Sequence, residues 1–121
     1  MTPTLRSPWA AVGALLVGLG VAVGAFGAHA LEPILTEDRM GTFETAVRYQ
    51  TVQGLGVLLL GLGPIAVRVG APLLVLGILV FSGSLYGIVA FDLPVLGAIA
   101  PVGGVMMIAA WIWTAWRLWR G

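Results

Sequence analysis

Long apolar runs alternate with short polar breaks along this chain. The first run covers residues 9–31 without a charged residue, and three more cover roughly residues 47–67, 72–91 and 95–118. At a rise of about 1.5 Å per residue, helices of this length cross a hydrocarbon core of about 30 Å. The pattern therefore predicts an all-α membrane protein with four transmembrane helices, folded as a single domain over residues 1–121.

The first run also has features of a signal peptide. Ala28-His29-Ala30 resembles a small-residue cleavage site, and Arg6 supplies a weakly positive start. The run is nevertheless longer than the apolar segment of about 7–15 residues that such peptides carry. We therefore expect it to be retained as a membrane helix.

The largest polar segment, residues 32–53, connects the first two predicted helices. Thr36 is a suitable N-cap for a helix whose first turn is acidic, and Glu44 and Arg48 have the spacing of a favourable i,i+4 pair. Apolar residues recur at helical spacing, namely Met40, Phe43 and Val47. The segment is thus predicted to form an interfacial amphipathic connector that continues into the second membrane helix.

The composition places the chain outside the range of soluble proteins. Hydrophobic residues make up 60% and charged residues 9% of the chain, and the mean hydropathy is +1.05. Cysteine and lysine are both absent, which excludes disulfides, thiolate chemistry and lysine Schiff bases. A net charge of +1 does not indicate nucleic-acid binding. The expected partners are the lipid bilayer, further copies of the chain, a larger membrane complex or an unidentified small molecule.

The arginines predict the orientation in the membrane. With four spans, Arg6, Arg68, Arg117 and Arg120 share the side of the two termini, and this side has no acidic residue. The other side has two arginines and all five acidic residues. Because basic residues are enriched in cytoplasmic loops, both termini are predicted to be cytoplasmic.

Polar residues are expected to gather in the outer half of the membrane. Buried polar side chains usually face the interior of a helical bundle, where they bond between helices or line a cavity. Interhelical bonds and a cavity lining are the two alternatives for this chain. Arg39 is further expected to reach a carboxylate or a helix end. The candidate polar cluster consists of His29, Arg39, Tyr49, Gln50, Gln53, Ser84 and Tyr86.

No catalytic, cofactor-binding or metal site is predicted. His29 is the only histidine, which excludes zinc sites with three histidine ligands. The segment Ser82-Gly83-Ser84 lacks the G-x-S-x-G frame of a hydrolase nucleophile, and no glycine-rich phosphate-binding loop is present. The chain is therefore expected not to be an enzyme.

Glycines at helical spacing predict faces for close helix packing. Small residues on one stripe allow two helix backbones to approach each other closely. One stripe lies on the first helix and a GxxxG pair lies on the third, and the predicted packing residues are Gly13, Gly20, Gly24, Gly27, Gly83 and Gly87.

These features favour a structural or accessory protein that packs with itself or with a larger membrane complex. The alternative is a small transporter or channel whose path enters through the outer polar layer. A path would need polar or small residues in the inner half as well, where leucine, valine and isoleucine predominate.

Four ordered sequence blocks resemble a known family. They are residues 24–31, Arg39 with residues 43–50, residues 81–86 and residues 101–104. They are similar to the signatures of the YgdD/YwdK-type small inner-membrane proteins, known as domain of unknown function 423 and related to the eukaryotic transmembrane protein 256. The resemblance implies four membrane helices in a bacterial cytoplasmic membrane, without an established activity, substrate or cofactor. Family members often have a histidine where this chain has Gln53.

Overall fold

The computed structural model describes residues 7–121, and every regular element in that part of the chain is helical. Arg6, which contributes to the predicted orientation, lies outside the described residues. The elements are α1 (Pro8–Ala22), the π-helical turn η1 (Val23–Gly27), α2 (Ala28–Leu31), α3 (Glu37–Leu62), α4 (Ile65–Arg68), α5 (Gly70–Phe91), the 3-10 helix η2 (Pro94–Ala98) and α6 (Ala100–Arg120).

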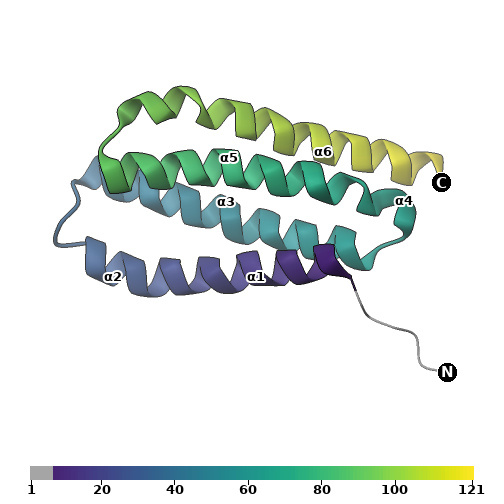
Figure 1. Cartoon of the computed structure of the whole chain (residues 1–121), viewed down its shortest axis with the longest axis horizontal. Helices are drawn as coiled ribbons and strands as arrows, with labels where there is room; N and C mark the ends of the chain where they lie inside the picture. The colour runs from purple at the N-terminus through teal and green to yellow at the C-terminus, as the bar shows by residue number, and fades with distance from the viewer. Residues whose placement is uncertain (1–6) are drawn as a thin grey trace.

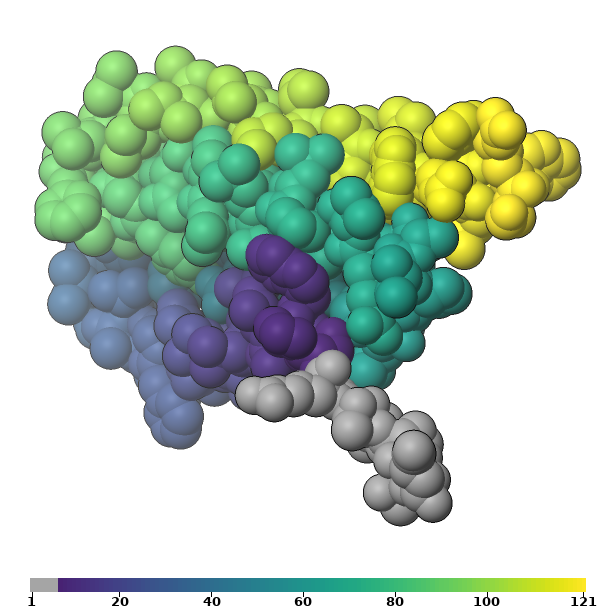
Figure 2. Space-filling model, turned by 45° about the vertical axis from the view of Figure 1, so that its right-hand side comes forward, coloured from purple at the N-terminus to yellow at the C-terminus, as the bar shows by residue number. Residues whose placement is uncertain are grey.

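The elements form four antiparallel rods that lie side by side in chain order (Figure 1). α1 packs on α3, α3 on α5, and α5 on α6. The start of α1, the short α4 and the end of α6 lie at one end of the bundle, and the α2–α3 loop and η2 lie at the other. The last turns of α6 project beyond the neighbouring helices (Figure 2). This topology agrees with the short predicted breaks, which force successive helices to be antiparallel neighbours.

Three of the predicted membrane helices have the length and composition of membrane spans. In the described part of the chain these are Pro8–Leu31, Ile65–Phe91 and Pro94–Arg120, with 24, 27 and 27 residues. α3 is as long, but its first half carries the charges of the predicted connector, which lower its hydropathy. The connector helix and the second apolar run are thus one continuous rod.

The boundaries of α3 differ from the prediction at its far end. Thr36 caps the helix as expected, since its hydroxyl accepts a hydrogen bond of 3.2 Å from the Arg39 backbone N–H. The helix ends at Leu62 rather than near Val67. Pro64 is the physical reason, because it disfavours helical backbone at the preceding residue, and Gly63 is extended there.

Glycines form the closest helix contacts, and larger side chains fill the core between them. Gly13 brings α1 so close to α3 that an added Cβ would lie 2.8 Å from the carbonyl oxygen of Gly54. Gly77 and Gly103 form an equivalent contact between α5 and α6, with 3.0 Å between an added Cβ on Gly77 and the Gly103 oxygen. Between these contacts lies a core whose buried members are Val57, Leu60, Val67, Ala71, Leu74, Ile78, Met107 and Ala110.

The predicted glycine stripe of the first helix faces α3 of the same chain. Cβ atoms added at Gly13, Gly20, Gly24 and Gly27 would meet Leu58, Thr51, Val47 and Phe43 respectively. The GxxxG pair of α5 is divided. Gly87 lies against Leu96 of η2, whereas Gly83 has no atom within 4 Å of an added Cβ. The first stripe is therefore an internal contact, and Gly83 is left open.

Candidate functional site

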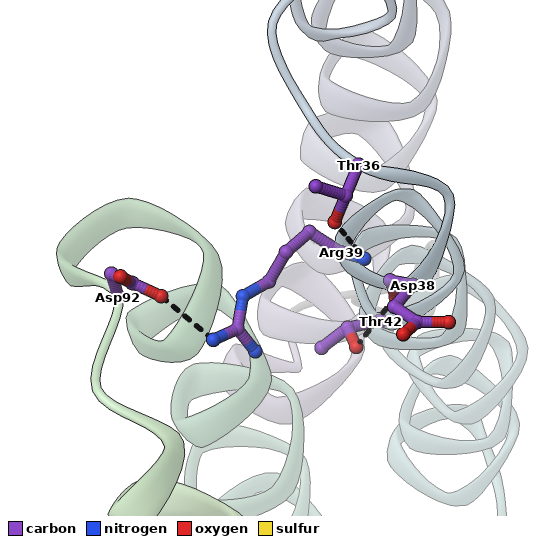
Figure 3. Close-up of polar contacts among 5 residues, drawn as sticks. All are labelled: Thr36, Asp38, Arg39, Thr42 and Asp92. Carbon is purple, nitrogen blue, oxygen red and sulfur yellow. Dashed lines mark hydrogen bonds and ion pairs between the residues drawn. The ribbon is translucent and has the colours of Figure 1, made fainter.

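An ion pair closes the end of the bundle at which α3 begins. The Arg39 Nη2 atom lies 2.7 Å from Asp92 Oδ1, so the first turn of α3 is tied to the turn after α5 (Figure 3). Asp92 ends α5 in the left-handed conformation, with φ 52°, which aspartate tolerates better than most residues. The expected reach of Arg39 to a carboxylate is observed. Asp92 was not among the candidate residues, although it is the one acidic residue outside the connector.

A buried hydrogen-bond network joins three helices below this ion pair. The Tyr86 hydroxyl donates to Gln50 Oε1 at 2.6 Å, and Gln50 Nε2 donates to the backbone oxygen of Leu16 at 3.0 Å. Gln50 is only 7% exposed. α5, α3 and α1 are thereby connected through one glutamine side chain, whose oxygen and nitrogen are both used.

Ser82 adds a further contact between α5 and α3. Its hydroxyl donates to the backbone oxygen of Ala46 at 2.8 Å. Ser84, not Ser82, was predicted to belong to the polar cluster. The spacing held a usable signal, because Ser82 and Tyr86 are separated by four residues and so lie on the same face of a helix.

A second polar pair lies between α3 and α6. Trp111 Nε1 donates to Gln53 Oε1 at 2.6 Å, and the rings of Tyr49 and Phe81 are 4.7 Å apart. These four residues line a groove of about 350 Å³. Trp111 was not among the candidate residues, because no local pattern shows which helix an indole faces.

Two candidate residues do not join either network. His29 is exposed and lines a separate groove of about 430 Å³ with Ala25, Ala28, Glu32, Met40 and Glu44. Ser84 is buried, but its hydroxyl donates to the Val80 backbone oxygen of its own helix. The expected convergence of all these side chains is thus wrong for His29 and Ser84.

The buried polar side-chain atoms are bonded within the chain. Within residues 7–121, every buried side-chain nitrogen and oxygen has a hydrogen-bond partner. In that same part of the chain, no group of three histidine, cysteine, aspartate or glutamate residues is placed to hold a metal ion. The side chains that meet between the helices do so as hydrogen-bond donors and acceptors, as for Gln50, Tyr86 and Ser82.

The fold is that of a small helical membrane protein. Its helices are long and apolar, its charges lie at the ends of the bundle, and the buried polar groups between its helices are hydrogen-bonded. A family model described as "Protein of unknown function (DUF423)" matches residues 23–104, and the chain belongs to this family. The match contains every residue of the candidate polar cluster, and it confirms the resemblance found in the sequence.

Curated relatives agree with this assignment. The chain is 43% identical to a UPF0382 membrane protein of Staphylococcus haemolyticus, over 84% of this chain and 86% of that protein. It is 37% identical to the UPF0382 membrane protein YwdK of Bacillus subtilis, over 84% of this chain and 87% of that protein. No solved structure matches the chain.

Proposed function

We propose that this chain is a non-enzymatic accessory protein of the bacterial cytoplasmic membrane, with four spans, cytoplasmic termini and a surface for self-association. The observation that carries this proposal is the saturation of the buried polar groups. In the described residues they all bond within the chain, as expected of groups that hold helices together. The bacterial relatives, which are named membrane proteins, support the location.

α3 is proposed as the fourth span. Its 26 residues reach roughly 39 Å, enough for the hydrocarbon core, and it lies between α1 and α5. Its two glutamines bond to neighbouring helices instead of facing lipid without a partner. Its charged first turns extend to the end of the bundle, where they contact Asp92.

The proposed orientation follows from the charges at the two ends. In the described residues, Arg68, Arg117 and Arg120 lie near the α4 end, whereas all five acidic residues lie near the other. The chain has no native cysteine, so single cysteines report accessibility directly. In intact cells, an impermeant maleimide should label Glu37→Cys but not Gly121→Cys. Labelling of Gly121→Cys alone would reverse the orientation.

The proposed association surface is the groove between α1 and α5. It measures about 220 Å³, and Leu19, Leu79 and Gly83 are part of its lining. Leu19 and Leu79 are 49% and 57% exposed, and Gly83 has no atom near an added Cβ. A helix from a second copy can approach the α5 backbone at this point.

Gly83→Leu tests this surface cleanly. Because the position is open, leucine does not clash within one chain, and it favours the helix over glycine. We expect the variant to keep its thermal unfolding transition and to lose cross-linked dimers in membranes. Gly18→Leu, at a second open position on α1, is the matched control and should leave the dimers unchanged. The replacement of Gly20 or Gly24 is unsuitable, since both contact α3.

Unchanged cross-linking of a folded Gly83→Leu variant would exclude this groove as the interface, and a wild-type chain that stays monomeric in membranes would contradict self-association.

The alternative function, a transporter or channel, is supported less well. The polar network adjoins a core of Val57, Leu74 and Ile78, which offers no polar route onward. Solute flux in vesicles that contain only this protein would favour that alternative.

A further inference from the structure

A second groove, between α3 and α6, has the shape and chemistry to hold an amphiphile. Its volume is about 350 Å³. From Gly104 to Ile112 it follows α6 for roughly 12 Å, the length of part of an acyl chain. Most of the lining is apolar and consists of Phe81, Gly104, Met107, Ile108 and Ile112.

This groove continues into a smaller one that ends at a cation. This smaller groove has a volume of about 290 Å³ and is lined by Arg48, Tyr49, Val52 and Gln53. Tyr49 and Gln53 line both grooves, so the two are contiguous. Together they form a track that is apolar beside α6 and positively charged at Arg48.

Arg48 has no counter-ion among the residues that the structure describes. The single ion pair found in residues 7–121 joins Arg39 to Asp92, so no carboxylate lies within 4.0 Å of Arg48. The expected partner, Glu44, lines the His29 groove instead. This corrects the predicted i,i+4 pair.

The position of Arg48 makes an external anion favourable. Arg48 is eleven residues into α3, roughly 16 Å from the start of the helix, and its side chain is exposed. Charged side chains at membrane depth are costly unless they pair or reach the interface. A long arginine side chain directed toward the start of the helix can extend to the depth of lipid headgroups.

Other donors lie beside the guanidinium. Gln53 accepts from Trp111 through Oε1, which leaves its amide nitrogen as a donor at the junction of the two grooves. Tyr49 is 39% exposed at the same junction. A phosphate diester has acceptor oxygens for such donors, and arginine binds phosphate in a bidentate manner.

From this arrangement we infer that the track is a binding site for an anionic phospholipid of the surrounding bilayer. The phosphate pairs with Arg48, and one acyl chain lies in the groove between α3 and α6. A lipid is chosen over a carboxylate from a second copy because one molecule supplies both the anion and an apolar chain of the length of the groove.

Native mass spectrometry of the full-length protein in a neutral detergent tests the site. Phosphatidylglycerol and diacylglycerol with identical acyl chains are added separately, because diacylglycerol lacks the phosphate. We expect retention of phosphatidylglycerol with about tenfold preference, the size of one hydrogen bond to a charged group. Arg48→Gln should remove the preference. Arg117→Gln, which changes an arginine at the other end of the bundle, is the matched control and should keep it.

A second variant probes the apolar part of the track. A Cβ at Gly104 would have its nearest contact at 3.9 Å, so Gly104→Leu is compatible with the fold and places its side chain in the groove. It should weaken the binding of both lipids. Equal retention of the two lipids by the wild-type chain, or an unchanged preference in Arg48→Gln, would overturn the inference. Dimers that form without lipid and depend on Arg48 would do the same, because they would identify a second copy as the occupant.

Discussion

Gln50 and Gln53 lie on the same helix, one turn apart, and serve opposite purposes. Gln50 is buried between α1 and α5, and both ends of its amide are bonded within the chain. Gln53 is half-buried, bonds through one oxygen to Trp111, and borders the open groove near Arg48. Residue type and depth are nearly equal, so the difference comes from the helices that surround each side chain.

The face of α3 that carries Gln50 packs against the backbone of α1. The oxygen of Leu16 is within reach of Gln50 because glycines let α1 approach α3. On the other side, α6 packs on α5 and contacts α3 through side chains such as Trp111. The first side therefore contributes mainly to stability and leaves only the groove of about 220 Å³ beside Gln50, whereas the second side leaves a larger groove of about 350 Å³ for a ligand.

The largest predicted effect comes from breaking the close contact of α1 with α3. Gly13→Leu would place a Cβ 2.8 Å from the Gly54 oxygen, and backbone atoms cannot move aside as a flexible side chain can. We expect a loss of about 3 kcal/mol or more, at the upper end for overpacked cores. Gly18→Leu, on the open face of α1, should be neutral. Thermal unfolding followed by circular dichroism compares the two, and equal melting temperatures would refute the packing argument.

An intermediate effect separates the two glutamines. Gln50→Leu removes two hydrogen bonds and leaves the Tyr86 hydroxyl without its acceptor, so we expect a loss of about 1–2 kcal/mol. Gln53→Leu removes one bond, which is worth about 0.6 kcal/mol on average in membrane proteins. Titration with a denaturing detergent measures both, and Ser84→Ala serves as a control without an interhelical bond. A larger loss for Gln53→Leu would reverse the comparison.

The smallest predicted effect concerns the ion pair at the end of the bundle. The side chain of Asp92 is 84% exposed and that of Arg39 is 29% exposed, so water and salt screen their attraction. Asp92→Asn should cost at most about 0.5 kcal/mol at low salt and nearly nothing at high salt. Unfolding at two salt concentrations checks this. A loss that does not depend on salt would contradict the description of this pair as a screened surface contact.

The polar cluster was predicted in part. Polarity and period located Gln50, Tyr86 and Arg39, because these residues interrupt apolar helices at sites where an unpaired group would be costly. The same criteria selected His29 and Ser84, which bond to no other helix, and passed over Ser82, Trp111 and Asp92. Polarity indicates that a side chain needs a partner, but it does not identify the partner.

The sequence by itself determined where the long helices lie along the chain. Runs of apolar residues define the long helices, Thr36 marks the start of α3, and charges segregate to the ends of the rods. The end of α3 before Pro64 was not predicted. The tertiary structure alone decided how each helix is rotated about its axis and which neighbour it meets. That choice turned the first glycine stripe inward, exposed His29 and separated Glu44 from Arg48. Helical periodicity fixes the angle between side chains on one helix, whereas the direction of each face depends on packing between residues that are distant in the chain.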